Sequence, residues 1–270
     1  MRTWIVLAVF GLGAALAASG PLTLGLWAKA PGFTLGPTLR FAYPVNPDLR
    51  LDLYVKTSLP KTGETAVGLG FSQSLEGGVL GRGEAGARVF LSVDARYWLE
   101  GHAKGSVGKG ALGLRLGYTE NRTPRHFWPL ERDSLGFYLD ADAAYRLDRR
   151  LVLEARYRYE NRASSGEVSF LWRTPRRRVR LGVGAVARPE QAYAVLGYGA
   201  RVSGAFLSGE LRVGSENELR LDYAEPGLKA ALALAYPPAA NAEVAYGPWA
   251  FAARVDRAGL EAHLRYTLGR

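Results

Sequence analysis

The side chains that could carry out chemistry are few in this chain, and their spacing does not favour catalysis. There is no cysteine, so neither a thiol nucleophile nor a disulfide framework is available. None of His102, His126 and His263 has a serine two residues away, as a His–Ser pair on one strand would need. Asp140 and Asp142 form an acid pair, but the chain contains no Asp-x-His to complete an acid–histidine centre. We therefore expect no catalytic residue and no enzymatic activity.

Binding motifs for metals and cofactors are also missing from the sequence. No metal-ligand cluster, phosphate-binding glycine loop or nucleophile elbow occurs, so we expect no metal and no cofactor. The acid pair, flanked by Arg146 and Arg156, is explained more simply as part of a charge network on a wet surface. As a solitary histidine, His263 is expected to face water.

The elements that must hold these charges are defined by residues 135–160. Every second residue from Leu135 to Leu147, and again from Leu151 to Tyr159, is apolar, and charged residues lie between them. A period of two is typical of extended strands with one apolar and one charged face. The break at 148–150 predicts a tight turn, so this segment is a hairpin. Each arm has about 9–11 residues, enough for a tilted strand to cross a bilayer.

The same alternation, interrupted by glycine, proline and polar turn signals, continues through the chain and predicts an all-β meander with no helix. The expected strands are 22–29, 33–43, 49–56, 67–72, 88–97, 112–118, 135–147, 151–160, 167–174, 178–187, 192–202, 205–214, 218–224, 228–236, 242–247, 249–256 and 260–268. Residues 79–83 are either a further short strand or a loop. With that strand the count is 18, our best estimate, and without it 14 or 16 follow.

The beginning of the chain has the features of a secretory signal peptide. Arg2 gives a positive start, and residues 4–16 form an apolar run too short to span a bilayer as a helix. We expect cleavage after Ala17, or alternatively after Ser19, leaving residues 18–270 as one domain. Secretion argues against nucleic acid as the partner of a chain with net charge +10. The excess of Arg over Lys and the scarcity of Asn and Gln indicate a thermostable protein.

A meander of this size is best explained as a closed membrane barrel. The alternative is a secreted β-sandwich or a soluble barrel, because alternation alone shows only that one face is apolar. However, an open meander has two unpaired edges, and closing the sheet removes both. A closed sheet of 14–18 strands leaves a lumen too wide for side chains to fill. The charged face must then be the wet interior, and the apolar face must meet lipid.

The final strand and the aromatic strand ends carry a resemblance to bacterial outer-membrane β-barrels, porins in particular. Leu260, Ala262, Leu264, Tyr266 and Leu268 share one face, although the chain closes on Arg270 and not on an aromatic residue. The resemblance implies an antiparallel transmembrane barrel in the outer membrane, in contact with lipid. It also implies passive diffusion of small hydrophilic solutes or ions. The alternative is a structural barrel that anchors a partner and conducts little. A homo-oligomer or an envelope partner is left open.

The expected pore lining consists of the charged residues on the even-numbered face of the strands. About 16 Lys or Arg stand against about 13 Asp or Glu there, which predicts a mild preference for anions. The simpler interpretation, compatible with the first, is cross-strand ion pairing that stiffens the wall. The pore-lining candidates are Arg40, Arg50, Asp52, Arg88, Asp94, Arg96, Arg115, Asp140, Asp142, Glu154, Arg156, Arg158, Arg180, Arg212 and Arg220.

The longest irregular segment, 120–134, combines cations with bulky apolar residues. Long loops in compact folds tend to be functional or disordered, and exposing large apolar side chains is unfavourable. One interpretation is that the aromatic residues rest on the rim or in the lipid interface. The other is that the loop folds over the pore and narrows it. The constriction candidates are Arg122, Arg125, His126, Trp128 and Arg132.

The second interpretation makes a prediction about conductance. If 120–134 narrows the pore, deleting residues 122–132 and joining the ends with glycine should raise single-channel conductance and weaken anion selectivity, because both bulk and positive charge are removed. Planar-bilayer recordings of the deletion variant and the parent protein measure both quantities. Equal conductance and equal reversal potential would show that this segment does not gate the pore.

Overall fold

The strands of this protein follow one another along the whole described chain. The structure, a computed structural model, describes residues 21–60, 65–77, 81–93, 95–119, 136–160, 163–187, 190–214, 217–236, 238–257 and 259–268. No helix in this part of the chain is long and apolar enough to cross a bilayer. The expected signal peptide and the segment 120–134 lie outside the described residues. The strands are β1 (Leu22–Ala30), β2 (Thr34–Pro44), β3 (Leu49–Lys56), β4 (Ala66–Glu76), β5 (Arg82–Ser92), β6 (Tyr97–Val107), β7 (Gly110–Thr119), β8 (Gly136–Arg146), β9 (Leu151–Glu160), β10 (Ala163–Arg173), β11 (Arg177–Ala187), β12 (Glu190–Val202), β13 (Ala205–Gly214), β14 (Asn217–Glu225), β15 (Leu228–Tyr236), β16 (Ala239–Tyr246), β17 (Trp249–Asp256) and β18 (Gly259–Leu268).

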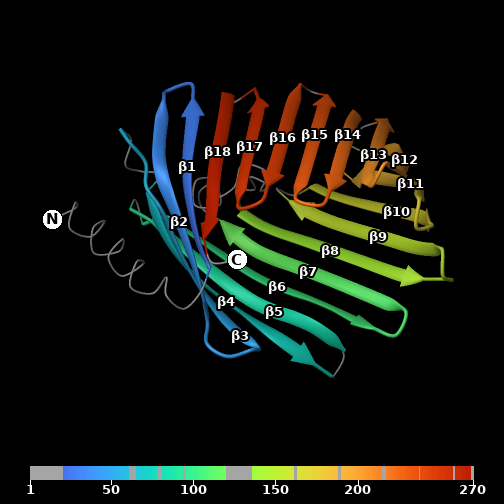
Figure 1. The fold of residues 1–270 in the computed structure, drawn as a ribbon, viewed down its shortest axis with the longest axis horizontal. Coiled ribbons are helices and arrows are strands. Elements are labelled where there is room, and N and C mark those ends of the chain that lie inside the picture. The colour runs from blue at the N-terminus through green and yellow to red at the C-terminus, as the bar shows by residue number, and fades with distance from the viewer. Residues whose placement is uncertain are drawn as a thin grey trace.

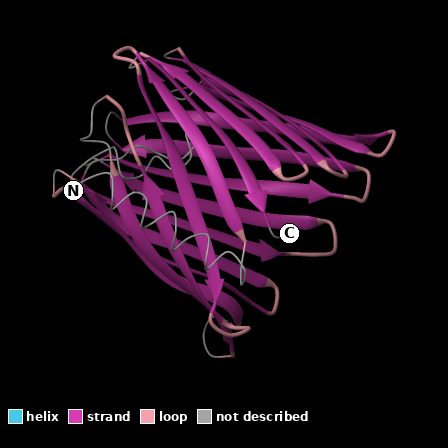
Figure 2. Cartoon of the chain, turned by 60° about the vertical axis from the view of Figure 1, so that its left-hand side comes forward, coloured by secondary structure: helices cyan, strands magenta, loops and turns pink. Residues whose placement is uncertain are grey.

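The 18 strands form one closed antiparallel sheet (Figures 1 and 2). Each strand pairs with its neighbours in sequence, and β1 also pairs with β18 from Leu22↔Leu268 to Ala30↔Leu260. No edge strand is left in this ring, so the backbone groups along β1 and β18 find partners in each other. The fold expected from the sequence, a closed meander barrel of 18 strands, is confirmed.

The two rims of the barrel differ in their connections. Because Leu22 is opposite Leu268, both ends of the strand ring lie at the same rim. We call this the short-turn rim, since its turns are short; they are 45–48, 77–81, 108–109, 147–150, 174–176, 203–204, 226–227 and 247–248. The opposite rim carries the two longest connections, 57–65 and 120–135, and we call it the long-loop rim.

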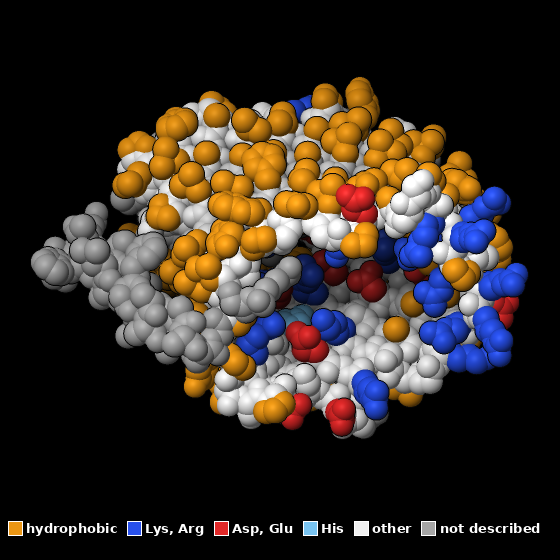
Figure 3. All heavy atoms as spheres, viewed as in Figure 1, with side chains coloured by type: hydrophobic (Ala, Val, Ile, Leu, Met, Phe, Trp, Pro, Cys, Tyr) orange, Lys and Arg blue, Asp and Glu red, His pale blue; other side chains and the backbone are white. Residues whose placement is uncertain are grey.

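Alternation along the strands sends apolar side chains outward and charged ones inward. Leu181 on β11, Leu221 on β14 and Leu232 on β15 are exposed on the outer surface, and Leu221 and Leu232 are cross-strand neighbours. Arg180 and Arg220, adjacent in sequence to two of these leucines, line the interior. Figure 3 shows the resulting cover of hydrophobic side chains on the outside, with charged side chains in the hollow. This arrangement is the one that a bilayer requires of a barrel.

The structure corrects the expected strands between 79 and 97. The predicted single strand 88–97 is wrong, because β5 ends at Ser92 and β6 begins at Tyr97. The backbone reverses at Ala95, which has a φ of 62°, and Arg96 donates its N–H to the Ser92 hydroxyl oxygen at 3.2 Å. Where a short strand or a loop was left open at 79–83, β5 begins at Arg82, and β6 was missed. These two errors cancel, so the count of 18 is right.

The hairpin between β8 and β9 shows how a short turn is built. The Asp148 carboxylate accepts hydrogen bonds from the backbone N–H of Arg150 at 2.5 Å and of Leu151 at 2.8 Å. These two hydrogen bonds hold the pKa of the Asp148 carboxyl below its ordinary value, and the bond from Arg150 has the larger effect. An aspartate that accepts nearby backbone N–H groups is a standard turn former, which explains why the sequence signal here was clear.

The two faces of β15 allow a direct test of this arrangement. Leu232 faces outward near the middle of the strand, while its neighbour Ala231 lines the interior. Leu232→Arg should lower the free energy of unfolding by about 2–4 kcal/mol, the cost of an arginine on the lipid face near the midplane. Ala231→Arg should change it by about 1 kcal/mol or less, because the new charge reaches water. Denaturant titration in lipid vesicles measures both; equal losses would contradict the assigned faces.

Candidate functional site

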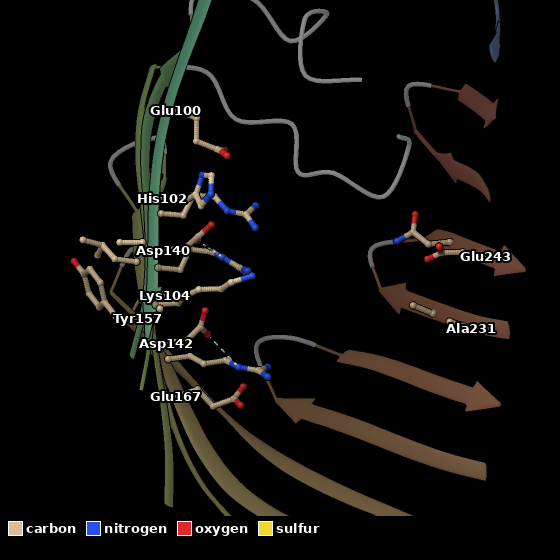
Figure 4. A pocket seen from close by; sticks show the side chains of 18 of the residues that line it. Glu100, His102, Lys104, Asp140, Asp142, Tyr157, Glu167, Ala231 and Glu243 are labelled. Carbon is tan, nitrogen blue, oxygen red and sulfur yellow. Dashed lines mark hydrogen bonds and ion pairs between the residues drawn. The ribbon is translucent and has the colours of Figure 1, made fainter. Parts of the chain in front are cut away.

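The interior of the barrel contains a large cavity that the inward faces of many strands surround. Its volume is about 1100 Å³. Figure 4 shows carboxylates and cations from one wall pointing into it, with Ala231 and Glu243 on the opposite wall. Of the candidates chosen from the sequence, those that line this cavity are Arg40, Arg50, Asp52, Arg88, Arg115, Asp140, Asp142, Arg156, Arg158, Arg180, Arg212 and Arg220.

The remaining candidates have other positions. Glu154 is not part of the cavity lining, but it forms an ion pair with Arg180 at 3.4 Å. Arg96 lies in the connection between β5 and β6, although the sequence pattern placed it within a single strand, 88–97. Asp94 lies outside the described residues. The same holds for the constriction candidates Arg122, Arg125, His126, Trp128 and Arg132.

Several charged residues of the lining were missed from the sequence, and β6 supplies three of them. Glu100, His102 and Lys104 alternate along β6 and point into the cavity (Figure 4). Their outward neighbours Gly101 and Ala103 are too small to give the apolar half of the pattern. The lining residues missed elsewhere are Glu84, Glu167, Glu218, Glu243 and Arg254.

Arg180 is the centre of the most extensive ion-pair network among the described residues. Its guanidinium lies 2.8 Å from Glu167 and 2.7 Å from Glu210, and its Nε donates to the Ser169 hydroxyl at 3.0 Å. Arg212 lies 3.4 Å from Glu167 and 3.3 Å from Glu210. The network therefore ties β10, β11 and β13 together across the inner wall. Because Arg180 and Glu167 are both buried, each depends on its partners to offset the loss of hydration.

A second group of inward side chains packs toward the long-loop rim. Tyr54, Phe90, Trp98 and Tyr138 form a buried aromatic cluster. The Phe90 and Trp98 rings are stacked with centroids 4.5 Å apart. Trp98 Nε1 donates to the Tyr138 hydroxyl at 3.0 Å, and that hydroxyl donates to Glu100 at 2.5 Å. The indole N–H of Trp98 and the hydroxyl of Tyr138 are thus satisfied, and the rings of the cluster occupy space on this part of the inner wall.

Near the seam between β1 and β18 the expectation for His263 is wrong. Its exposed fraction is 2%, so it does not face water. Its Nε2 lies 3.2 Å from a Glu261 carboxylate oxygen, and its ring centroid is 6.2 Å from that of Trp27. Trp27 is itself fully buried and donates its indole N–H to the Thr57 carbonyl at 2.8 Å. The inner face of the seam is therefore packed with side chains.

Inward glycines make room for some of these rings. A Cβ on Gly117 would collide with Tyr138, and one on Gly184 would collide with Tyr193. The Tyr193 hydroxyl, lying over Gly184, donates to Glu167 at 3.3 Å. At these two positions a cross-strand ring occupies the space that the glycine leaves, as known for glycines in sheets.

The lining is almost balanced in charge. It contains eleven Lys or Arg and ten Asp or Glu. Most of these belong to cross-strand or same-strand ion pairs, such as Arg158–Asp140 at 2.9 Å and Arg220–Asp222 at 3.0 Å. Arg115 has no ion pair with any described residue. Within the described ranges, no group of three His, Cys, Asp or Glu is suited to hold a metal ion.

Comparison with known proteins supports the fold and gives no closer assignment. No family model matches the chain, and no curated protein matches it in sequence. Among solved structures, OccK10 (OpdN) of Pseudomonas aeruginosa has a TM-score of 0.54 at 10% identity, over 93% of this chain and 98% of that one. A BenF-like porin from Pseudomonas fluorescens Pf-5 has a TM-score of 0.52 at 11% identity, over 93% and 97%. OpdK of Pseudomonas aeruginosa, solved with vanillate, has 0.50 at 12%, over 92% and 97%.

These neighbours are porins, which are channels and not enzymes. At such low identity the likeness establishes the fold alone: the chain has the closed β-barrel fold of bacterial outer-membrane porins, with 18 strands in its own ring. The apolar outer surface and the absence of a free sheet edge in the strand ring are the physical reasons that such a barrel belongs in the outer membrane.

The Arg180 network leads to a prediction about stability. Arg180→Gln should lower the free energy of unfolding by about 3–5 kcal/mol, because it leaves the buried Glu167 charge without its nearest cation. Arg220→Gln is the matched control, since Arg220 and Asp222 are both accessible to water, and should cost about 1 kcal/mol or less. Denaturant titration of both variants in vesicles gives the comparison. Similar small losses would mean that the network does not stabilise the wall.

Proposed function

We propose that this barrel is a channel for passive diffusion of small hydrophilic solutes or ions, with a mild preference for anions. The observation that carries the proposal is the charged cavity of about 1100 Å³ inside a closed barrel. Pockets that bury one drug-sized ligand measure about 300–1,000 Å³ and are mostly apolar. This cavity is larger and charged on most sides, which suits hydrated solutes in transit better than one tightly held ligand.

The preference for anions rests on exposure and not on a large excess of cations. The side chain of Arg40 is 42% exposed, whereas its partner Asp52 is 5% exposed. Lys104 is 67% exposed against 31% for Glu84. A solute beside this part of the wall meets the cations first, because the carboxylates lie behind them. The Arg180 network is arranged the other way, with Glu154 and Glu210 more exposed than Arg180, so the net effect should be mild.

One solute to test follows from the comparisons. The structure of OpdK was solved with vanillate, a small aromatic carboxylate. A carboxylate of that size would suit a lumen whose exposed charges include Lys104 and Arg115, which has no ion pair with a described residue. We therefore include benzoate-sized carboxylates among the candidate permeants of this chain.

A second candidate function has an observation in its favour. The aromatic cluster of Tyr54, Phe90, Trp98 and Tyr138 fills part of the lumen toward the long-loop rim. A barrel narrowed in this way could instead anchor a partner and conduct little. Conductance separates the two functions, because only the channel carries a substantial ohmic current.

The channel proposal predicts both a current and its charge dependence. Purified protein in a planar bilayer should give stepwise ohmic currents, and a KCl gradient should give a small reversal potential of the sign for chloride preference. Lys104→Gln with Arg115→Gln should abolish that preference, because these cations are exposed or free of ion pairs with described residues. Asp142→Asn with Glu243→Gln is the matched opposite change and should strengthen it.

Three results would contradict this proposal. Absence of ohmic current from folded, inserted protein would leave the anchoring function. A reversal potential of the sign for potassium preference would remove the anion preference. The same would follow if both double variants kept the parent's reversal potential, since the lumen charges would then not act on the ions.

A further inference from the structure

The net charge of the protein is not explained by its lumen. The chain carries +10, yet the cavity lining is nearly neutral with eleven cations and ten acids. A large part of the excess is concentrated at four adjacent turns of the short-turn rim, which connect β6 to β7, β8 to β9, β10 to β11 and β12 to β13. These turns and the strand ends beside them contain nine cations and a single acid, Asp148. The nine are Lys109, Arg146, Arg149, Arg150, Arg173, Arg176, Arg177, Arg178 and Arg201.

We call these nine residues the rim patch. All nine side chains are exposed, and none has an ion pair with a described residue. Figure 3 shows Lys and Arg side chains gathered at the edge of the molecule where Figure 1 has the turn that connects β8 to β9. Elsewhere on this rim the turns are mixed or uncharged: 247–248 is Gly-Pro, and 226–227 lies between Glu225 and Lys229. The rim patch therefore lies on one side of the short-turn rim, and its cations are more concentrated than those of the other turns of this rim.

The height of the rim patch in the membrane is set by its outward neighbours. Trp172 on β10 and Tyr198 on β12 are both exposed on the outer surface and both lie opposite Val179 on β11. Aromatic residues of this kind gather at the bilayer interface, at the level of the lipid headgroups. Arg177 is the next outward-facing residue beyond Val179 toward the turn. Its guanidinium therefore emerges from the lipid-facing surface directly beside this aromatic row.

Two groups within the rim patch differ in direction. Arg146, Arg173, Arg178 and Arg201 share the inward face of their strands and lie around the mouth of the lumen. Lys109, Arg149, Arg150 and Arg176 are in the turns, and Arg177 faces outward. A patch that served only entering solutes would not need cations on the outer face. A protein partner would not require the adjacent aromatic row at the interface.

We propose that the turn and outward-facing cations of the rim patch bind the phosphate headgroups of anionic phospholipids in the leaflet at the short-turn rim. Guanidinium groups match phosphate oxygens with two parallel hydrogen bonds, and Arg makes up most of the patch. The aromatic row holds these groups at headgroup height. The single acid of these turns, Asp148, interacts electrostatically with Arg150 and Lys109, which leaves Arg149, Arg176 and Arg177 for phosphate. The bound lipids would fix this side of the barrel in the bilayer, and their phosphates would neutralise the positive charge of the rim patch.

Tryptophan fluorescence provides the test, because two tryptophans on this rim form a matched pair. Trp172 lies beside the rim patch, and Trp249 is on the same rim beside the uncharged turn 247–248. Single replacement of each by Phe, compared with the double replacement, isolates the signal of each. The protein is placed in phosphatidylcholine vesicles that contain a small equal fraction of brominated phosphatidylglycerol or brominated phosphatidylcholine, and quenching gives the relative association of the two lipids.

We expect phosphatidylglycerol to associate at Trp172 about fivefold more strongly than phosphatidylcholine, which is the effect of roughly one Lys or Arg at an anionic surface. At Trp249 the ratio should be about one. Salt at about 1 M should remove the difference, because the screening length then falls to about 3 Å. Arg176→Gln with Arg177→Gln should lower the ratio at Trp172 toward that at Trp249. The control, Arg96→Gln with Arg257→Gln, removes two exposed cations from the long-loop rim and should leave the ratio unchanged.

The outcomes that overturn the proposal are distinct from failure of the channel function. Equal ratios at Trp172 and Trp249, or a ratio that Arg176→Gln with Arg177→Gln does not lower, would show that the rim patch does not bind anionic lipid. If the same variant shifted the reversal potential in a KCl gradient while lipid association stayed unselective, the patch would serve entering ions. Unchanged far-UV circular dichroism of each variant ensures that a folded barrel is compared.

Discussion

The pairing of β1 with β18 is the constraint on which the rest of this structure depends. A bilayer offers no hydrogen-bond partner to a backbone N–H or C=O group, so a sheet can span it only when its first and last strands bond to each other. Closing 18 strands in this way makes the lumen wide. The outside must then be apolar, and the inside must accommodate charged groups and water. The exposed leucines of β11, β14 and β15 and the charged cavity are two consequences of one closure.

The interior of the barrel is neither an unobstructed channel nor a fully packed core. Carboxylates such as Glu167 are buried against Arg180, so the wall is stiffened by charges that water reaches only in part. Toward the long-loop rim, rings from neighbouring strands occupy the space that inward glycines provide, as Tyr138 does over Gly117. What is left is an asymmetric passage, with exposed cations such as Lys104 on one side and small residues such as Ala231 on β15 on another. Passive passage of small hydrated solutes is the function that these features support best.

The fold could be predicted from the sequence for two reasons. Alternation with a period of two decides which side chains point into the barrel and which point out, and the need to avoid unpaired edge strands decides that the sheet closes. Prediction from the sequence failed where the alternation of apolar and polar residues did not reveal the strand boundaries. The reversal at Ala95 uses no glycine or proline and depends on the Ser92 side chain, so alternation seemed to run through it. β6 was missed because the outward residues in its middle are Gly101, Ala103 and Gly105, and the inward Glu100, His102 and Lys104 were missed with it. The burial of His263 could not be predicted either, because its cover comes from Trp27, 236 residues away in sequence and brought close only by closure of the barrel.

The central claim is that water and ions pass along the inner face of this sheet. Because the chain has no cysteine, a single one is a unique reporter. Ala233 lines the cavity, and its neighbour Leu234 is exposed on the outer surface of the same strand. Single-channel recording of Ala233→Cys during addition of a bulky charged methanethiosulfonate should show a stepwise fall in conductance, and Leu234→Cys should show none. A fall at Leu234→Cys, or no change at Ala233→Cys after labelling proven by mass spectrometry, would contradict the account.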